Sequence, residues 1–295
     1  MDMIKPFGFY MTELIGCENS GVVYKCIHRE SKRIVAMKFF KNREEFDKEL
    51  LIHELLTNPY IVGYIGYCID EKKRKFIIIT ELASKGSLYK KLLSKNGLKY
   101  ANKREISLDL ANAILYMHSH NIVHHDIKPR NILFDKKQKV KLTGFGVSSV
   151  LNTPMCNVSV TSGLKAPEVT TENVNDFKSD VYSYGIVLWE LFMETNYLKN
   201  DGSPPIIPDY CPKTLKTLLS KCWSNKPHQR PSISYIIEYI NQHGDNLFTK
   251  NYEPTLLPKA EQTTKTTTND NDTINSRLPP LKKKQQPMNV RSHCT

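Results

Sequence analysis

Two glycines near the amino terminus could bring backbone amides to a phosphate group. The segment IGCENSGVVY places Gly16 and Gly21 between two strand-like runs. Glycines in a strand-turn-strand hairpin let backbone N–H groups approach phosphate oxygens closely. Glu18 lies between them, and its carboxylate would repel a phosphate. Taken alone, the segment fits an ordinary hairpin equally well, so its interpretation depends on the residues that accompany it.

A second segment, VHHDIKPRNILFD, combines a carboxylate, an ammonium and a carboxamide at close spacing. It resembles the protein kinase catalytic loop H-R-D-x-x-x-x-N, with His125 in the arginine position. The resemblance implies that Asp126 accepts the proton of a substrate hydroxyl and that Lys128 neutralises the transferring phosphoryl group. It also implies that Asn131 ligates a metal ion. A lysine two residues after the aspartate is typical of serine/threonine kinases.

The segment VAMK, residues 35–38, matches the kinase V-A-I-K strand. By this resemblance Lys38 contacts the α- and β-phosphates of a nucleotide and is oriented by an acidic residue on the next helix. Glu49 is the candidate, because it lies nine residues before NPYIV, the spacing that kinases show. The same ion pair could instead serve only to position the helix.

The resemblance extends to the remaining nucleotide-binding and bracing positions. It implies backbone hydrogen bonds to adenine beside the gatekeeper Thr80, apolar walls, and a buried ion pair that braces the second lobe. The adenine contacts and walls are Glu81, Ala83, Val23, Ala36 and Leu133; the bracing residues are Glu168 in the Ala-Pro-Glu motif, Arg230, and Asp180 on the central helix. The wall residues could equally be packing residues.

The pattern of apolar residues predicts the elements that position these groups. Strands are expected in the β-branched and aromatic runs 9–16, 22–28, 34–40 and 75–82. A helix over 43–58 interrupts them, with Phe46, Leu50, Leu51 and Leu55 on its buried side. After residue 85 the pattern becomes helical, over 87–95, 103–120, 179–193, 213–223 and 232–242.

The predicted fold class is therefore α+β, a bilobal protein kinase-like fold. Residues 1–83 form a small five-stranded N-lobe with one main helix, and residues 84–245 form a helical C-lobe. The basic tail 246–295 has too few apolar residues to fold and is expected to be disordered. Only 20 residues separate Glu190 from Cys211, so the helix that kinases place there is expected to be reduced or missing.

The segment KVKLTGFGVSS departs from the kinase pattern, because Gly144 stands where Asp-Phe-Gly supplies the metal-binding aspartate. Together with GYCIDE and SDVYSYGIVLWE, it resembles the pseudokinase domain of the mixed lineage kinase domain-like proteins of necroptosis. In that family a membrane-permeabilising helical bundle precedes the pseudokinase. Fewer than ten residues precede the first predicted strand here, an arrangement similar to truncated poxvirus-encoded homologues.

Composition narrows the class of protein further. The net charge is +12, but lysines are scattered without interleaved aromatics, so no nucleic-acid partner is expected. The longest apolar runs are too short to span a bilayer, so no membrane insertion is expected. Seven cysteines without metal-ligand spacing, and no secretory signal, predict a reduced, cytoplasmic location, in the host cell if the chain is viral.

The leading hypothesis is a pseudokinase decoy that binds the host receptor-interacting serine/threonine kinase and so inhibits necroptosis. No cofactor is required; ATP binding is expected to be weak, and Gly144 puts magnesium binding in question. The alternative is an active atypical serine/threonine kinase with one metal held by Asn131. A third hypothesis is a switch that binds nucleotide through Lys38 without turnover. Hydroxyl-bearing residues in the segment 144–168 are candidates for phosphorylation by the partner kinase.

Overall fold

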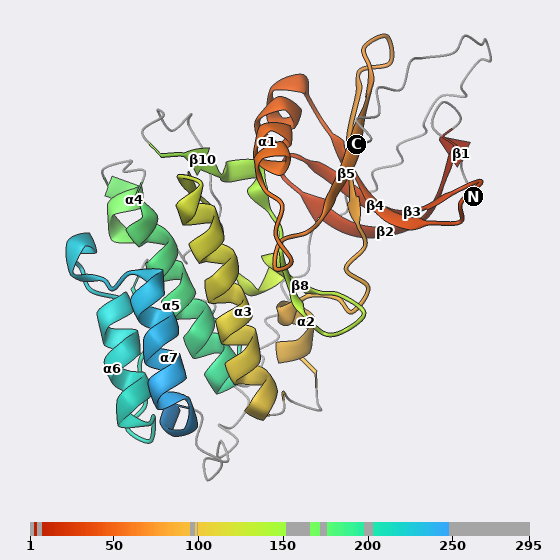
Figure 1. The fold of residues 1–295 in the computed structure, drawn as a ribbon. Helices are drawn as coiled ribbons and strands as arrows, with labels where there is room; N and C mark the ends of the chain where they lie inside the picture. Colours follow the sequence, from red (N-terminus) through yellow and green to blue (C-terminus); the bar gives the residue numbers. More distant parts are fainter. Residues whose placement is uncertain are drawn as a thin grey trace, which may run out of the picture.

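The computed structural model describes residues 3–4, 8–94, 98, 100–151, 166–171, 176–197 and 203–247. Its N-lobe is built on one antiparallel sheet. Its six strands are β1 (Met3–Ile4), β2 (Phe9–Glu18), β3 (Gly21–His28), β4 (Ile34–Phe40), β5 (Tyr64–Asp70) and β6 (Lys75–Glu81). They lie in the order β1-β2-β3-β4-β6-β5 (Figure 1). The predicted five-stranded N-lobe is confirmed: the four predicted strand ranges correspond to β2, β3, β4 and β6, and β5 is the fifth strand. The two-residue β1 adds to the edge at β2.

One helix, α1 (Arg43–Leu55), packs on this sheet. Its first turn is capped by Asn42, whose side chain accepts a hydrogen bond from the Glu45 N–H at 2.9 Å. Phe46 is fully buried and meets the rings of Phe40 and Phe76. The helix ends three residues earlier than predicted.

The predicted buried face of α1 is wrong in part. Leu51 and Leu55 are 52% and 46% exposed, whereas Glu49 and His53 are buried beside Phe46. The helix turns this polar pair inward because Glu49 contacts Lys38 on β4. The ion pair between Lys38 and Glu49 therefore decides which side of α1 faces the sheet, and the two leucines remain exposed.

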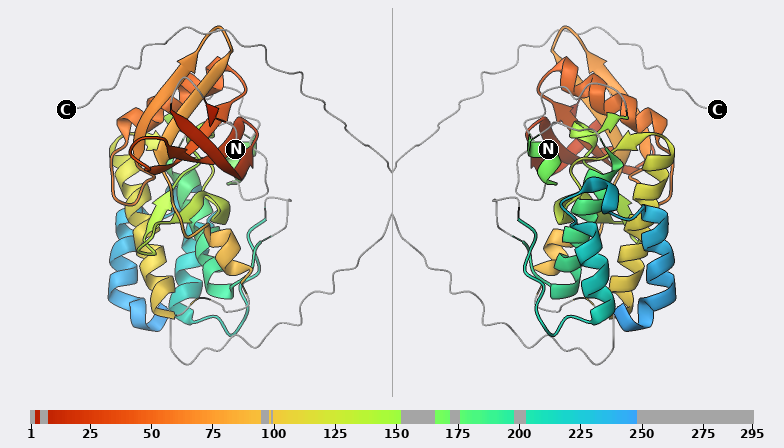
Figure 2. Two further views of the ribbon diagram at one scale, coloured as in Figure 1. Left: turned by 90° about the vertical axis from the view of Figure 1, so that its right-hand side faces the viewer. Right: turned by 90° about the vertical axis from the view of Figure 1, so that its left-hand side faces the viewer.

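The C-lobe is helical and lies below the sheet (Figure 2). Its helices are α2 (Leu88–Leu92), α3 (Tyr100–Ser119), α4 (Pro167–Thr171), α5 (Phe177–Met193), α6 (Lys213–Cys222) and α7 (Ile233–Leu247). It also contains two small antiparallel strand pairs, β7 (Ile122–Val123) with β10 (Ser149–Val150) and β8 (Ile132–Phe134) with β9 (Val140–Leu142). The catalytic loop lies between β7 and β8 in the chain. Helix α5 runs through the core, with most of its side chains buried.

The chain between α5 and α6 contains no helix in its described residues, 194–197 and 203–212. This agrees with the expected loss of a helix in that region. No helix in the described ranges is long and apolar enough to cross a membrane. The predicted disordered tail, apart from its first two residues, lies outside the described residues.

Candidate nucleotide and catalytic site

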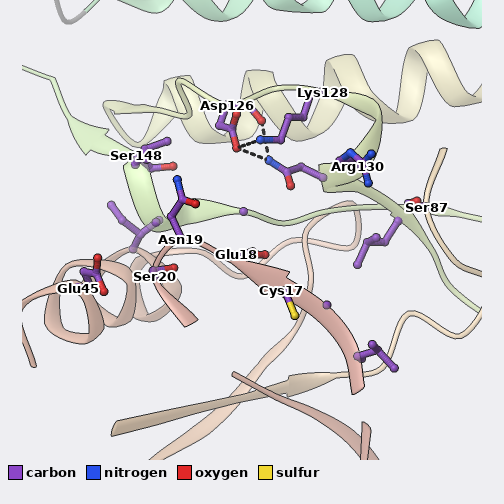
Figure 3. Close-up of a pocket in the computed structure, with 18 of the residues that line it drawn as sticks. Cys17, Glu18, Asn19, Ser20, Glu45, Ser87, Asp126, Lys128, Arg130 and Ser148 are labelled. Carbon is purple, nitrogen blue, oxygen red and sulfur yellow. Dashed lines mark hydrogen bonds and ion pairs between the residues drawn. The ribbon is translucent and has the colours of Figure 1, made fainter. Parts of the chain in front are cut away.

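A cleft of about 1440 Å³ lies between the two lobes (Figure 3). The glycine hairpin covers it from the N-lobe, and the catalytic loop borders it from the C-lobe. Of the residues that the sequence suggested for nucleotide binding or catalysis, or as departures from the kinase pattern, those that line the cleft are Gly16, Glu18, Ala83, Asp126, Lys128, Asn131, Leu133 and Gly144. The cleft thus brings together residues from both predicted lobes.

Lys38 forms the predicted ion pair with α1. Its Nζ lies 2.7 Å from Glu49 Oε2, and both side chains are buried. A second carboxylate, that of Glu18, also contacts the Lys38 ammonium. Burial alone would lower the pKa of Lys38, but the carboxylates of Glu49 and Glu18 outweigh burial and raise that pKa. Burial raises the pKa of the Glu49 carboxyl, against the attraction of Lys38.

Strand register explains how Glu18 reaches Lys38. Gly16 on β2 pairs with Val23 on β3, and Val23 pairs with Lys38 on β4. Glu18 follows Gly16 by two residues and so points to the same face of the sheet. The sequence placed Glu18 near the phosphates but did not reveal its contact with the lysine.

The catalytic loop holds its polar residues against one another. Lys128 Nζ lies 2.7 Å from Asp126 Oδ2, and the Asn131 amide donates to the same oxygen at 2.8 Å. The amide also donates to the Asp126 carbonyl at 2.7 Å. The Asp126 N–H donates to His124 Nδ1 at 3.1 Å. The predicted grouping of Asp126, Lys128 and Asn131 is therefore present, with its members paired within the loop (Figure 3).

Gly144 has the left-handed backbone angle φ +92°. A Cβ at this position would lie 2.5 Å from Asn131 Nδ2 and 2.9 Å from its Oδ1. The Asn131 side chain thus fills the space that a side chain at 144 would need. Glycine supplies no ligand, and no group of three His, Cys, Asp or Glu side chains in the described ranges could hold a metal ion. At this position the chain therefore lacks the carboxylate that protein kinases use to hold magnesium.

We expect Gly144→Asp to lower stability rather than restore a metal site. The aspartate must adopt a positive φ and displace Asn131 from its bonds to Asp126, a cost of about 1–3 kcal/mol. Urea denaturation with and without magnesium measures this. Gly66→Asp is the control, because nothing lies within 4 Å of the Cβ it would add. Unchanged stability together with stabilisation by magnesium would contradict the expectation.

Asp180 organises the backbone of the catalytic loop from α5. It accepts the N–H groups of His124 and His125, each at 2.9 Å, and contacts His118 Nε2 at 2.9 Å. Complete burial would raise the pKa of Asp180, but the hydrogen bond and charge of His118 hold this pKa below its usual value. His125, in the arginine position, contacts Ser149 Oγ at 2.9 Å, a contact that the sequence did not indicate.

Four rings form a column that connects the two lobes. Tyr64 on β5 stacks on His53 of α1 at 5.9 Å between ring centroids, and His53 meets Phe145 edge-on at 5.1 Å. Phe145 in turn meets His124 at 5.5 Å. Burial, assisted by the charge of Lys38, lowers the pKa of His53 to about 3, so its imidazole is neutral at physiological pH. We refer to these residues as the aromatic column.

The other predicted nucleotide positions divide into three groups. Gly16, Ala83 and Leu133 line the cleft. Val23 and Ala36 lie on β3 and β4 but do not border it. Gly21 and Glu81 have structural roles, described next.

Gly21 allows close approach of two strands. A Cβ there would lie 2.0 Å from the Phe39 carbonyl oxygen, so only glycine fits. The Glu81 side chain accepts a hydrogen bond from the Gly63 N–H at 2.9 Å and pairs with Lys141 at 2.7 Å. The close approach of the strands explains why position 21 is glycine, and the contacts with Gly63 and Lys141 explain why position 81 is glutamate.

The second lobe is braced by the ion pair expected from the sequence. Arg230 donates to the two carboxylate oxygens of Glu168 at 2.5 and 2.8 Å. It also donates to the backbone carbonyls of Lys178 and Ser224, each at 2.9 Å. The Arg230 side chain is completely buried.

Two lobes with a buried Lys–Glu pair, an Asp–Lys–Asn catalytic loop and an Asp-anchored central helix define a protein kinase-like domain. Comparison with protein families agrees, because the protein kinase domain family matches residues 9–243. The chain belongs to the protein kinase family.

Curated relatives point to the same family. Serine/threonine-protein kinase STY17 of Arabidopsis thaliana is 32% identical over 250 residues, 77% of this chain and 43% of that protein. Dual specificity protein kinase shkB of Dictyostelium discoideum is 32% identical over 249 residues, 75% of this chain and 38% of that protein. A third relative, from Acanthamoeba polyphaga mimivirus, carries the provisional name of a serine/threonine-protein kinase/receptor and is 35% identical over 248 residues, 77% of this chain. The chain spans only 15% of that relative and less than half of the other two.

Proposed function

We propose that this protein is a pseudokinase that acts by binding another protein rather than by transferring phosphate. The observation that carries the proposal is Gly144, where no carboxylate is available and the Asn131 side chain fills the adjacent space. Phosphoryl transfer depends on positioning and charge neutralisation by metal ions. The pairing of Asp126 with Lys128 and Asn131 leaves the catalytic loop engaged with itself.

The partner that we propose is the receptor-interacting serine/threonine kinase of necroptosis, bound in the cytoplasm of the host cell. This part of the proposal rests on the resemblance of VKLTGFG and SDVYSYGIVLWE to the mixed lineage kinase domain-like pseudokinases. Sequestration of that kinase would inhibit necroptosis. Failure of the purified protein to capture the kinase from cell extracts would refute the choice of partner.

A phosphoryl-transfer assay separates chemistry from binding. With labelled ATP and magnesium or manganese, we expect the protein to give no more labelled product than its Asp126→Asn variant, because no metal carboxylate stands at 144. Asp126→Asn keeps the size of the side chain, so capture of the partner kinase should be unchanged. Label that disappears in the variant would show a working kinase and overturn the proposal.

An active serine/threonine kinase is the second candidate. The names of the relatives favour it, since they are serine/threonine or dual specificity kinases. Retention of the Lys38–Glu49 pair at 2.7 Å and of Asp126 at the cleft also favours it. Under this candidate, Asp126→Asn would abolish both the transfer of label and the biological effect.

A further inference from the structure

The two ends of the cleft differ in chemical character. At the end formed by Gly16, Ala83 and Leu133, the lining includes small and apolar residues together with Leu82. At the other end, where Lys38 would meet nucleotide phosphates, the cleft is lined by Glu18 and not by Lys38. Lys38 is only 8% exposed. The cation that should attract phosphate is therefore covered.

Glu18 provides this cover from the tip of the glycine hairpin. Its carboxylate contacts the Lys38 ammonium, on which Glu49 also lies at 2.7 Å. Lys38 is thus shared between two carboxylates, and no net positive charge remains for a third anion. Figure 3 places Glu18 at the end of its strand, among the residues that line the site. A phosphate would have to displace Glu18 and then remain close to it.

The hairpin is also closed onto the opposite side of the site. A Cβ added to Gly146 would lie 3.0 Å from Glu49 Oε2, 3.6 Å from Ser20 Oγ and 3.9 Å from Lys38 Nζ. Ser20 of the hairpin therefore lies against the segment that follows Gly144. Backbone pairing between the Lys41 N–H and the Ser20 carbonyl at 3.0 Å holds the hairpin tip to β4.

We propose that Glu18 is a built-in ligand of Lys38 that makes the cleft selective for ligands without phosphate. The adenine end remains open, whereas the phosphate end is occupied by a carboxylate of the chain itself. Adenosine should then bind at least as tightly as ATP, the reverse of the order expected for a site built to hold a triphosphate. The inference concerns binding alone and does not depend on the identity of the protein partner.

Isothermal titration calorimetry with adenosine and with metal-free ATP tests this on the full chain. For the unmodified protein we expect ATP to bind no more tightly than adenosine. Glu18→Gln keeps the size of the side chain and removes its charge, so ATP affinity should rise by on the order of tenfold, about 1.4 kcal/mol. Adenosine affinity should change by no more than about twofold, since it carries no phosphate.

Glu30→Gln is the matched control, because it makes the same change of charge at an exposed turn. It should leave both affinities unchanged.

Glu18→Gly removes the whole side chain and should tighten ATP binding further. This variant replaces Glu18→Gln in the test if Glu18→Gln fails to fold. Tighter binding of ATP than of adenosine by the unmodified protein would overturn the proposal. The proposal would also be overturned if ATP affinity were the same with and without Glu18, or if ATP bound to none of these proteins. Failure of adenosine to bind any of these proteins would refute an open adenine end. Because no turnover is measured, these results are distinct from those of the phosphoryl-transfer assay.

Discussion

Replacing Arg230 with methionine is expected to destabilise the protein by about 3–5 kcal/mol, because it leaves the Glu168 carboxylate buried without its partner. Glu168 is only 7% exposed. Two backbone carbonyls, of Lys178 and Ser224, lose their donor as well. A loss of this size is a large fraction of the stability of an ordinary domain. Urea denaturation, followed by circular dichroism, measures it.

Two control variants locate the cause of the effect. Arg43→Met removes an arginine whose ion pairs, with Asp47 and Glu71, are exposed, and it should cost no more than about 1 kcal/mol. The double variant Arg230→Met/Glu168→Met should recover part of the loss, since it buries no unpaired charge. An Arg230→Met protein as stable as Arg43→Met would show that the buried pair does not brace the lobe.

Replacing Glu190 with glutamine is expected to stabilise the protein at alkaline pH. Burial on α5 raises the pKa of Glu190 to about 8. Its Oε1 accepts the Tyr197 N–H at 2.8 Å, and Oε2 has no hydrogen-bond partner within the described part of the chain. Ionisation therefore places a poorly compensated carboxylate in the core. Glutamine keeps the acceptor and cannot ionise.

The sign follows from proton linkage. The folded state holds the Glu190 proton more tightly than the unfolded state, so the proton stabilises folding below about pH 4.5. This contribution is lost as the pH rises from there through about 8, at up to roughly 1.4 kcal/mol per pH unit. The stability advantage of Glu190→Gln should grow between pH 5 and 8 and then level off. An advantage that does not change with pH would contradict the assignment. Glu238→Gln, on the surface-facing part of α7, serves as the charge control.

Much of the fold and several site contacts could be predicted because the relevant motifs are local. The Asp126–Asn131 segment forms its own contacts within six residues, so its sequence nearly determines its geometry. The Lys38–Glu49 pair links a strand to the next helix along the chain, and the spacing to NPYIV was enough to choose the glutamate. Glu168 and Arg230 are far apart in sequence, and only the family resemblance connected them.

What could not be predicted depended on register and on competition between contacts. Strands β2 and β3 shift register between Met11 and Glu13 and again between Leu14 and Gly16. Such bulges change which side chains share a face, so the contact between Glu18 and Lys38 could not be derived from spacing. The buried side of α1 was misjudged because apolar periodicity favoured Leu51 and Leu55, whereas the ion pair turned Glu49 and His53 inward.

The aromatic column has a consequence for the thermodynamics of association. Its rings join α1, the segment after Gly144 and the catalytic loop through protein contacts alone. The two lobes are consequently linked by ring contacts that lie within the protein itself. A partner that recognises both lobes meets a pre-organised surface and loses less conformational entropy on docking. Association of this kind should proceed as a single rigid-body step, with a rate constant of about 10⁵–10⁷ M⁻¹s⁻¹ and little dependence on added nucleotide.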